Sequence, residues 1–207
     1  MAEYTPQVDK SHYGASYRSK DRWLSYYHQL SLVNSCAPTS VLEVGPGEGI
    51  VTANLRQSGV AVTTVDIAPD LKPDVIASVT ALPFKDGEFD LALAAEILEH
   101  IEFSDVPKAL SELARVSQHH VVVSLPHPGL VFSLAFKIPL LPRLELWFQI
   151  PLFWQTHRFN GEHYWELGKR GLPVSRFLSC AKEAGLTLLK TIKHADDPVH
   201  RLFVFTK

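Results

Sequence analysis

The sequence has few of the residues that mark a secreted, disulfide-stabilised protein. Only 2 of its 207 residues are cysteine, and Cys36 and Cys180 form neither a C-x-x-C pair nor a metal-ligand spacing. The first ten residues contain no apolar stretch of the kind that opens a secretory signal. We therefore expect a reducing, cytoplasmic environment.

The chain also lacks a strong excess of charge and a long unbroken apolar run. Its formal net charge of -2 and its isoelectric point near 6.5 give no electrostatic reason to expect a nucleic-acid partner. A transmembrane helix needs ~20 consecutive apolar residues, and prolines and charges interrupt the most apolar region. With 46% hydrophobic and 20% charged residues, we predict a single globular domain spanning residues 1–207.

Residues 41–66 predict a strand, a glycine turn, a helix and a second strand. Glycines such as Gly45 and Gly47 let the chain turn sharply and let a ligand approach the backbone closely. The helix that follows points its N-terminal amides at that ligand. Asp66 ends the second strand about 20 residues further on, where an acid can accept both hydroxyls of a ribose. The unit therefore predicts a nucleoside-binding site.

Charges around the turn indicate which nucleoside binds. Glu43 and Glu48 would repel a pyrophosphate but attract a cation. Ile50 occupies the position where the dinucleotide fingerprint has its third small residue. A ribose-containing cofactor with positive charge and no phosphate fits this pattern, and S-adenosyl-L-methionine is such a cofactor.

Three motifs together resemble the class I S-adenosylmethionine-dependent methyltransferases, and in particular the small type 11-like group. They are EVGPGEG at residues 43–49 followed by Asp66, ALPFKDGEFD at residues 81–90, and AEILEHI at residues 95–101. The resemblance implies an α/β, Rossmann-like doubly wound fold. Its mostly parallel seven-stranded sheet would have an antiparallel C-terminal edge strand and helices on both faces.

The resemblance also implies which residues bind the cofactor. The family usually has an acid four residues before Leu82, where it contacts adenine, but this chain has Ser78. The Ser78 hydroxyl, or the backbone of Val79 or Thr80, would then bind the base. An N-terminal helical segment, residues 13–36, would cover the site through Tyr17, Arg18 or Gln29. The predicted cofactor-binding residues are Tyr17, Gln29, Glu43, Gly45, Pro46, Gly47, Asp66, Ile67, Ser78, Val79, Thr80, Ala95, Glu96 and His100.

Periodicity predicts the remaining elements. Residues 1–12 are expected to be flexible, and residues 13–34 to form a helix that buries Trp23 and Leu30 and has Asp21 as its cap. The other predicted elements are helices at residues 106–116 and 173–184 and strands at residues 75–79, 89–94, 121–125, 186–194 and 201–206.

Residues 130–168 form an unusually apolar insertion. Three prolines and several charges interrupt it, so it does not predict a membrane-spanning helix. Two interpretations remain open. The segment is either a lid with an apolar inner face over the active site, or residues 130–154 form a surface that docks on a membrane or on a second subunit.

Histidines supply the candidate catalytic groups. Methyl transfer to an oxygen or nitrogen requires removal of a proton, for which a histidine suffices. The candidates are His127, after the fifth predicted strand, and His157 and His163 in a polar cluster that also holds Glu162. The cluster could instead be a loop held by aromatic packing. Its spacing matches no standard zinc motif, so we predict no metal.

These patterns favour an S-adenosylmethionine-dependent methyltransferase that acts on a small, apolar or amphipathic acceptor by O-, N- or C-methylation. A non-catalytic module that binds the cofactor or a protein partner on the same fold is the alternative, and Ser78 in place of the acid mildly favours it. A nicotinamide-dependent oxidoreductase is a third interpretation, which Ile50 weakens.

Overall fold

The computed structural model describes residues 6–7, 10–14, 17–140 and 144–207. Its centre is a seven-stranded sheet in the order β3-β2-β1-β4-β5-β9-β8. Strands β1 to β5 are parallel, whereas β9 runs antiparallel to β5 and to β8. The strands are β1 (Ser40–Val44), β2 (Ala61–Asp66), β3 (Val75–Ile76), β4 (Phe89–Ala95), β5 (Ser117–Pro126), β8 (Thr187–His194) and β9 (Asp197–Thr206). The predicted Rossmann-like fold is confirmed.

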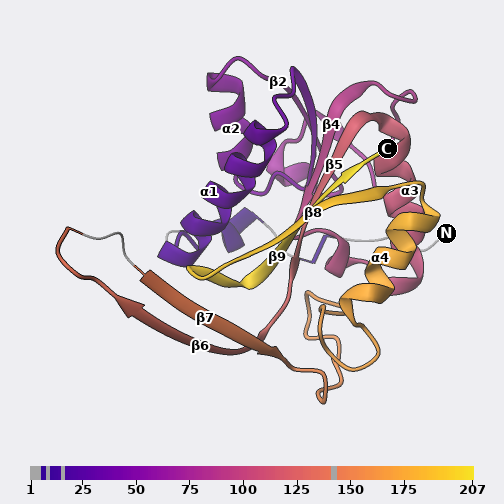
Figure 1. The fold of residues 1–207 in the computed structure, drawn as a ribbon. Coiled ribbons are helices and arrows are strands. Elements are labelled where there is room, and N and C mark those ends of the chain that lie inside the picture. Colours follow the sequence, from indigo (N-terminus) through magenta and orange to yellow (C-terminus); the bar gives the residue numbers. More distant parts are fainter. Residues whose placement is uncertain (1–5, 8–9, 15–16, 141–143) are drawn as a thin grey trace.

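Helices cover both faces of the sheet (Figure 1). On one face lie α1 (Lys20–Ser35) and α2 (Ile50–Gln57), and on the other lie α3 (Val106–Val116) and α4 (Val174–Glu183). The core is accordingly divided in two, and alternate residues of β4 enter different halves, as the two-residue period of a strand requires. Leu91 and Leu93 pack on the α1 and α2 side, whereas Ala92 and Ala94 pack on the α3 and α4 side.

Helix α1 differs from its prediction in its start and in its buried face. It begins at Lys20, and the Ser19 hydroxyl rather than Asp21 caps it, accepting a hydrogen bond from the Arg22 amide. Trp23, which was expected in the core, is 49% exposed. The buried residues include the polar Gln29, whose amide donates to the Ser25 hydroxyl. The apolar pattern was misleading because local hydrogen bonds allow polar residues to face the sheet.

The last strand is longer than predicted. The sequence suggested a loop through Pro198 and a last strand from Arg201, but β9 already begins at Asp197. His194 of β8 pairs directly with Asp197 of β9, so a tight turn joins the two strands and sets their register. As a consequence, His200 pairs with Pro126 at the end of β5 where the ligand site lies. Strand β3, by contrast, is shorter than the predicted residues 75–79.

The apolar insertion contains a separate β-hairpin. Strands β6 (Gly129–Phe136) and β7 (Leu144–Pro151) pair with each other and with no strand of the main sheet. Figure 1 shows the hairpin extending away from the body of the molecule. The described helices include none with the length and apolar character that a membrane crossing needs.

Candidate functional site

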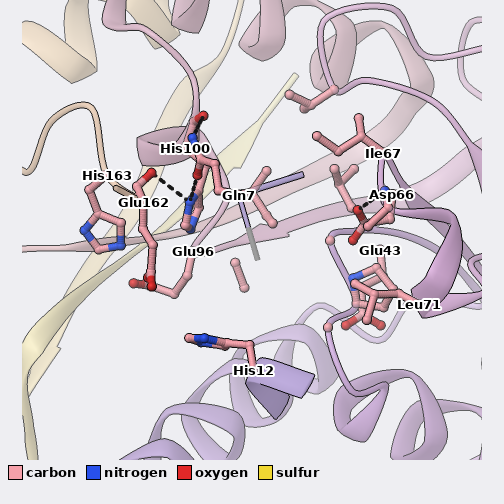
Figure 2. A pocket seen from close by; sticks show the side chains of 18 of the residues that line it. Gln7, His12, Glu43, Asp66, Ile67, Leu71, Glu96, His100, Glu162 and His163 are labelled. Carbon is pink, nitrogen blue, oxygen red and sulfur yellow. Dashed lines mark hydrogen bonds between the residues drawn. The ribbon is translucent and has the colours of Figure 1, made fainter. Parts of the chain in front are cut away.

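A cavity of about 430 Å³ lies at the carboxyl ends of β1, β2 and β4. This is the topological switch point of the sheet, where β1 lies between β2 and β4 and where α/β folds bind their ligands. Figure 2 shows Glu43 and Asp66 on one side of the cavity and Glu96, His100 and His163 on the other.

The glycine turn after β1 is shaped by a positive φ and a close contact. The Gly45 amide donates to the Val65 carbonyl oxygen at 2.8 Å, which joins the turn to β2. Gly45 has φ of +69°, and a Cβ there would lie 1.8 Å from Cδ1 of Ile97. No other residue type fits this position without displacing the wall of the cavity.

Two acids line the predicted cofactor half. Glu43 is buried, accepts a hydrogen bond from the Thr52 hydroxyl, and has its pKa raised to about 7 by burial. A nearby cation would favour its ionised form. Asp66 accepts a hydrogen bond from the Ala68 amide through Oδ1 at 2.8 Å, and burial raises its pKa as well. Both carboxyl groups belong to residues that line the cavity.

The predicted adenine end is only partly as expected. Ile67, Ser78 and Val79 line the cavity, but Thr80 does not. The Thr80 hydroxyl lies 2.9 Å from the Ser78 hydroxyl, and its amide donates to the same Ser78 oxygen at 3.2 Å. Thr80 therefore holds Ser78 in place. Leu71, which no sequence pattern indicated, also lines this end.

The N-terminal segment covers the cavity. Tyr17 and Gln29 line it as predicted, whereas Arg18 lies outside, with its Nε 2.6 Å from Oε2 of Glu48. Tyr26, which the sequence did not assign to the site, donates its hydroxyl to the same carboxylate at 3.2 Å. Glu48 thus fastens the N-terminal segment to the glycine turn, a role that charge alone did not suggest.

Tyr13 and Arg22 are further site residues that were not predicted. The Tyr13 ring lies against the glycine turn, because a Cβ on Gly47 would lie 3.1 Å from its Cε1. The Arg22 guanidinium lies 4.5 Å from the centre of the Tyr17 ring. The density of tyrosines before α1 was the available signal.

Glu96 and His100, which were predicted to contact the cofactor, line the cavity at the end opposite Asp66. Glu96, with φ of +55°, accepts a hydrogen bond from the Ser124 hydroxyl at 2.6 Å, and its other oxygen lies 3.4 Å from Nε2 of His200. Nδ1 of His100 lies 2.6 Å from Oε1 of Gln7 and 3.1 Å from the Glu162 carbonyl oxygen (Figure 2). Burial lowers the pKa of His100 to about 4, so this ring is neutral near pH 7.

The three predicted catalytic histidines lie in different places, and only His163 lines the cavity. Its Nδ1 lies 3.2 Å from Oε1 of Glu166, and Oε2 of Glu166 lies 2.7 Å from Nζ of Lys169. Although burial opposes the effect, the hydrogen bonds from His163 and Lys169 lower the pKa of Glu166 to about 2. Glu166 is therefore an anion that holds the His163 ring in one orientation.

The other two histidines lie away from the cavity lining. Nε2 of His157 donates to the His163 carbonyl oxygen at 2.9 Å, so His157 supports the loop that holds His163. His127 lies beneath Gly168, where a Cβ would come within 2.5 Å of Nε2. Burial lowers the pKa of His127 to about 3, and its ring nitrogens have no hydrogen-bond partner in the described part of the chain.

His200 is a site residue that the sequence analysis missed. It lines the cavity between Glu96 and Asp197, with Nδ1 2.7 Å from Oδ1 of Asp197. Although burial opposes the effect, the two carboxylates raise the pKa of His200. The antiparallel direction of β9 was the available signal, since it brings the start of β9 to the carboxyl edge of the parallel strands.

Potential metal ligands come together twice among the described residues. His28, His194 and Asp196 form one group, and Glu99, His100 and His163 form the other, each with three ligand atoms within 4.8 Å of one another. The His28 and His194 rings are stacked 3.5 Å apart, so their in-plane lone pairs do not converge. Burial and Glu96 raise the pKa of Glu99. The expectation of no metal stays a prediction.

Comparisons with known proteins agree with this geometry. A family model described as a methyltransferase domain matches residues 42–123. No curated protein sequence matches the chain. Among solved structures, the chain is similar to 1,6-didemethyltoxoflavin-N1-methyltransferase from Burkholderia thailandensis, crystallised with 1,6-didemethyltoxoflavin and S-adenosylhomocysteine. The identity is 16%, the alignment covers 96% of this chain and 86% of that one, and the TM-score is 0.62.

Two further solved structures show how widely this fold is used. The N-methyltransferase NodS from Bradyrhizobium japonicum, in complex with S-adenosylhomocysteine, is 15% identical over 91% of this chain and 88% of its own, with a TM-score of 0.57. The cyclase SpnF is 12% identical over 86% of this chain and 80% of its own, with a TM-score of 0.56. At such identities a likeness shows the fold, and function has to be argued from the site.

Proposed function

We propose that this chain transfers the methyl group of S-adenosyl-L-methionine to a small acceptor. Its class I methyltransferase fold and the match of residues 42–123 to a methyltransferase-domain family support the proposal. One observation carries the proposal. A single cavity at the switch point of the sheet has a glycine turn with two acids at one end and an oriented histidine at the other.

The cofactor half suits S-adenosyl-L-methionine in charge and shape. Asp66 ends β2, where a carboxylate can accept the two ribose hydroxyls, while its Oδ1 is held by the Ala68 amide. Glu43 provides a buried carboxyl group near the glycine turn, suited to a cationic amino or sulfonium group. Ile67 and Val79 offer apolar contact for the adenine ring, and Ser78 offers a polar one.

The other half suits an acceptor with a hydroxyl or amino group. Methyl transfer from a sulfonium is a displacement in line with the breaking bond, so alignment of the acceptor supplies much of the rate. We assign the proton-accepting role to His163, because it lines the cavity and Glu166 fixes its ring. The same loop carries Glu162, which lines the cavity next to His163.

The residues that line the cavity also indicate the class of acceptor. Apart from the cofactor half, its lining is rich in histidine and glutamate, as His163, His200 and Glu162 illustrate. None of the described residues of β6 or β7 lines it, so the apolar hairpin does not form the acceptor wall in this conformation. We therefore favour an amphipathic acceptor whose polar, ionisable part enters the cavity.

A second candidate function is a non-catalytic module that binds the cofactor. Ser78 favours it, because the acid of related enzymes is absent and the serine hydroxyl is engaged with Thr80. The similarity to a protein described as a cyclase shows that the fold by itself does not imply methyl transfer. In this candidate the cofactor half would work and the His163–Glu166 pair would have no catalytic effect.

Calorimetric titration with S-adenosylhomocysteine, with NADH as the control ligand, tests the proposal first. Micromolar binding of S-adenosylhomocysteine alone would support the assigned cofactor, whereas binding of NADH or of neither ligand would contradict it. Transfer of a radioactive methyl group from S-adenosyl-L-methionine to a panel of alcohols, phenols and amines then separates the two candidates. A protein that binds the cofactor but methylates no acceptor of any class would favour the non-catalytic module.

A further inference from the structure

The β6–β7 hairpin has one face made entirely of large apolar side chains. Because register pairs residues across the two strands, four cross-strand pairs lie on this face. The pairs are Leu130–Ile150, Phe132–Phe148, Leu134–Leu146 and Phe136–Leu144. Their exposed fractions run from 37% to 59%, and the Phe132 and Phe148 rings are stacked 4.9 Å apart. A contiguous apolar surface of this kind in water marks a docking site.

The apolar face is directed away from the body of the protein. Gln149 lies on the opposite face, and its amide donates to the carbonyl oxygens of His127 at 2.9 Å and Pro198 at 3.1 Å. That opposite face, which also carries Ser133 and Glu145, is therefore the one turned to the body at the base of the hairpin. In Figure 1 the hairpin runs out beneath the sheet, with its far end clear of other elements.

Apolar residues continue beyond the paired strands at both ends. Ile138 is 58% exposed and Leu140 is fully exposed where the chain leaves β6, at the far end of the hairpin. At the base, Phe153 and Trp154 are exposed just after β7. Aromatic side chains of this kind favour the boundary between lipid tails and water.

The charge of this segment is opposite to that of the rest of the chain. Residues 129–158 contain three basic residues, Lys137, Arg143 and Arg158, but only one acid, Glu145, while the whole chain has a net charge of -2. In the sequence, Lys137 and Arg143 flank the apolar stretch between the strands. Basic residues next to an apolar surface attract anionic lipid headgroups.

We propose that the apolar face of the β6–β7 hairpin docks on an anionic lipid surface. A second copy of the chain would cover only the flat face of the hairpin. A lipid surface would also cover the exposed apolar residues at its far end and at its base, so we favour lipid. The hairpin joins the site directly, since Pro126 and Pro128 line the cavity and β6 begins at Gly129. A membrane-borne acceptor would therefore meet the protein close to its cavity. Docking itself does not depend on methyl transfer.

Flotation of the full-length protein with vesicles tests the proposal. We expect binding to vesicles of equimolar phosphatidylcholine and phosphatidylglycerol, and weaker binding to phosphatidylcholine alone. The double variant Phe132→Ser/Phe148→Ser should reduce binding about tenfold or more, because two large apolar groups leave the lipid contact. Lys137→Glu should reduce binding to the anionic vesicles about fivefold. The matched control Val131→Ser/Ala135→Ser alters the opposite face and should bind like the unaltered protein.

Three results would overturn the proposal. The natural protein could bind neither vesicle, the Phe132→Ser/Phe148→Ser variant could bind as well as the natural protein, or this variant and its control could lose vesicle binding equally. Sedimentation velocity without lipid tests whether a second copy of the chain covers this face instead. If the natural protein is a dimer, if only the Phe132→Ser/Phe148→Ser variant dissociates it, and if no lipid binds, the face belongs to a dimer interface. Circular dichroism and thermal unfolding check that each variant is folded, and because neither measurement needs a ligand, failure of the docking proposal can be distinguished from failure of the proposed function.

Discussion

Nδ1 of His163 lies 3.2 Å from Oε1 of Glu166, and the second oxygen of that carboxylate lies 2.7 Å from Nζ of Lys169. A carboxylate can only accept, so Nδ1 of His163 carries the hydrogen and Nε2 has the free lone pair. The arrangement resembles the way catalytic histidines are oriented in other enzymes, by an acid that holds the ring and stabilises its protonated form.

Replacing either partner of this pair should therefore slow methyl transfer. We expect His163→Ala to lower kcat by about a hundredfold or more, the contribution of a positioned base, and Glu166→Gln to have a smaller effect. The affinity for S-adenosylhomocysteine should stay within about twofold in both, because neither residue belongs to the cofactor half. Steady-state kinetics with any accepted substrate gives the answer. His119→Ala, an exposed histidine elsewhere, is the control, and full activity of His163→Ala would refute the assignment.

Asp66→Ala should abolish measurable cofactor binding. Hydrogen bonds from the ribose hydroxyls to a charged group contribute about 1.5–3 kcal/mol each, so loss of both predicts a Kd at least about a hundredfold higher. Calorimetry with S-adenosylhomocysteine measures the change. Asp70→Ala removes an acid that lies outside the cavity lining and should bind normally. An unchanged Kd for Asp66→Ala would mean that the ribose is not held at the end of β2.

Gly45→Ala should destabilise the fold through a defined contact. The new Cβ would lie 1.8 Å from Cδ1 of Ile97 at a φ of +69°, which predicts a loss of about 2–4 kcal/mol from overpacking and strain together. Gly59 has a comparable φ of +87°, and no atom of the described residues lies within 4 Å of a Cβ built there, so Gly59→Ala should cost only the strain, about 1–2 kcal/mol. Adding Ile97→Ala to Gly45→Ala should recover part of the difference. Urea denaturation measures all four proteins, and equal losses for Gly45→Ala and Gly59→Ala would contradict the contact.

The buried carboxyl group of Glu43 should make stability depend on pH. It ionises near its ordinary pKa of 4.5 in the unfolded chain but at about 7 in the folded protein, because burial disfavours the charge. Between these values the folded state binds more protons, so its stability falls as pH rises and levels off above pH 7. Relative to the natural protein, Glu43→Gln should gain stability from pH 5 to pH 8, by up to about 3 kcal/mol.

Denaturant unfolding at several pH values tests this expectation. A difference between the two proteins that does not change with pH would contradict the raised pKa. Because Glu43 is also assigned to the cationic end of the cofactor, the same variant should bind S-adenosylhomocysteine more weakly. Greater stability at pH 8 together with weaker binding would show a group placed for ligand recognition at the expense of stability.

Ser78→Asp should strengthen binding by introducing the acid that the resembled methyltransferase family usually has at this position. A charged acceptor forms a stronger hydrogen bond with the adenine amino group than a hydroxyl does, by about 1 kcal/mol, which corresponds to a Kd about fivefold lower. The Thr80 hydroxyl and amide, which now contact Ser78, can also donate to the new carboxylate. Weaker binding would place the adenine elsewhere in the cavity.

The sequence was most informative where local chemistry is restrictive. The glycine turn, the acid at Asp66 and the LPF motif predicted the fold and the cofactor half, because few side chains fit a tight turn or accept two ribose hydroxyls. Helix α3 occupies the predicted residues 106–116, since its apolar period is uninterrupted. The pattern failed for α1, where polar residues such as Gln29 are buried and Trp23 is exposed.

The acceptor half was decided by the tertiary structure. His163, Glu96 and His200 are far apart in the chain, and they meet because β4 ends, β9 begins and the loop before α4 passes at the same edge of the sheet. No spacing rule links them, so the sequence ranked His127, His157 and His163 equally, although only His163 lines the cavity. By itself the sequence determined the fold class and predicted a nucleoside site, because both depend on residues close together in the chain. Which histidine faces the acceptor, and which way the apolar hairpin points, depended on packing between distant segments.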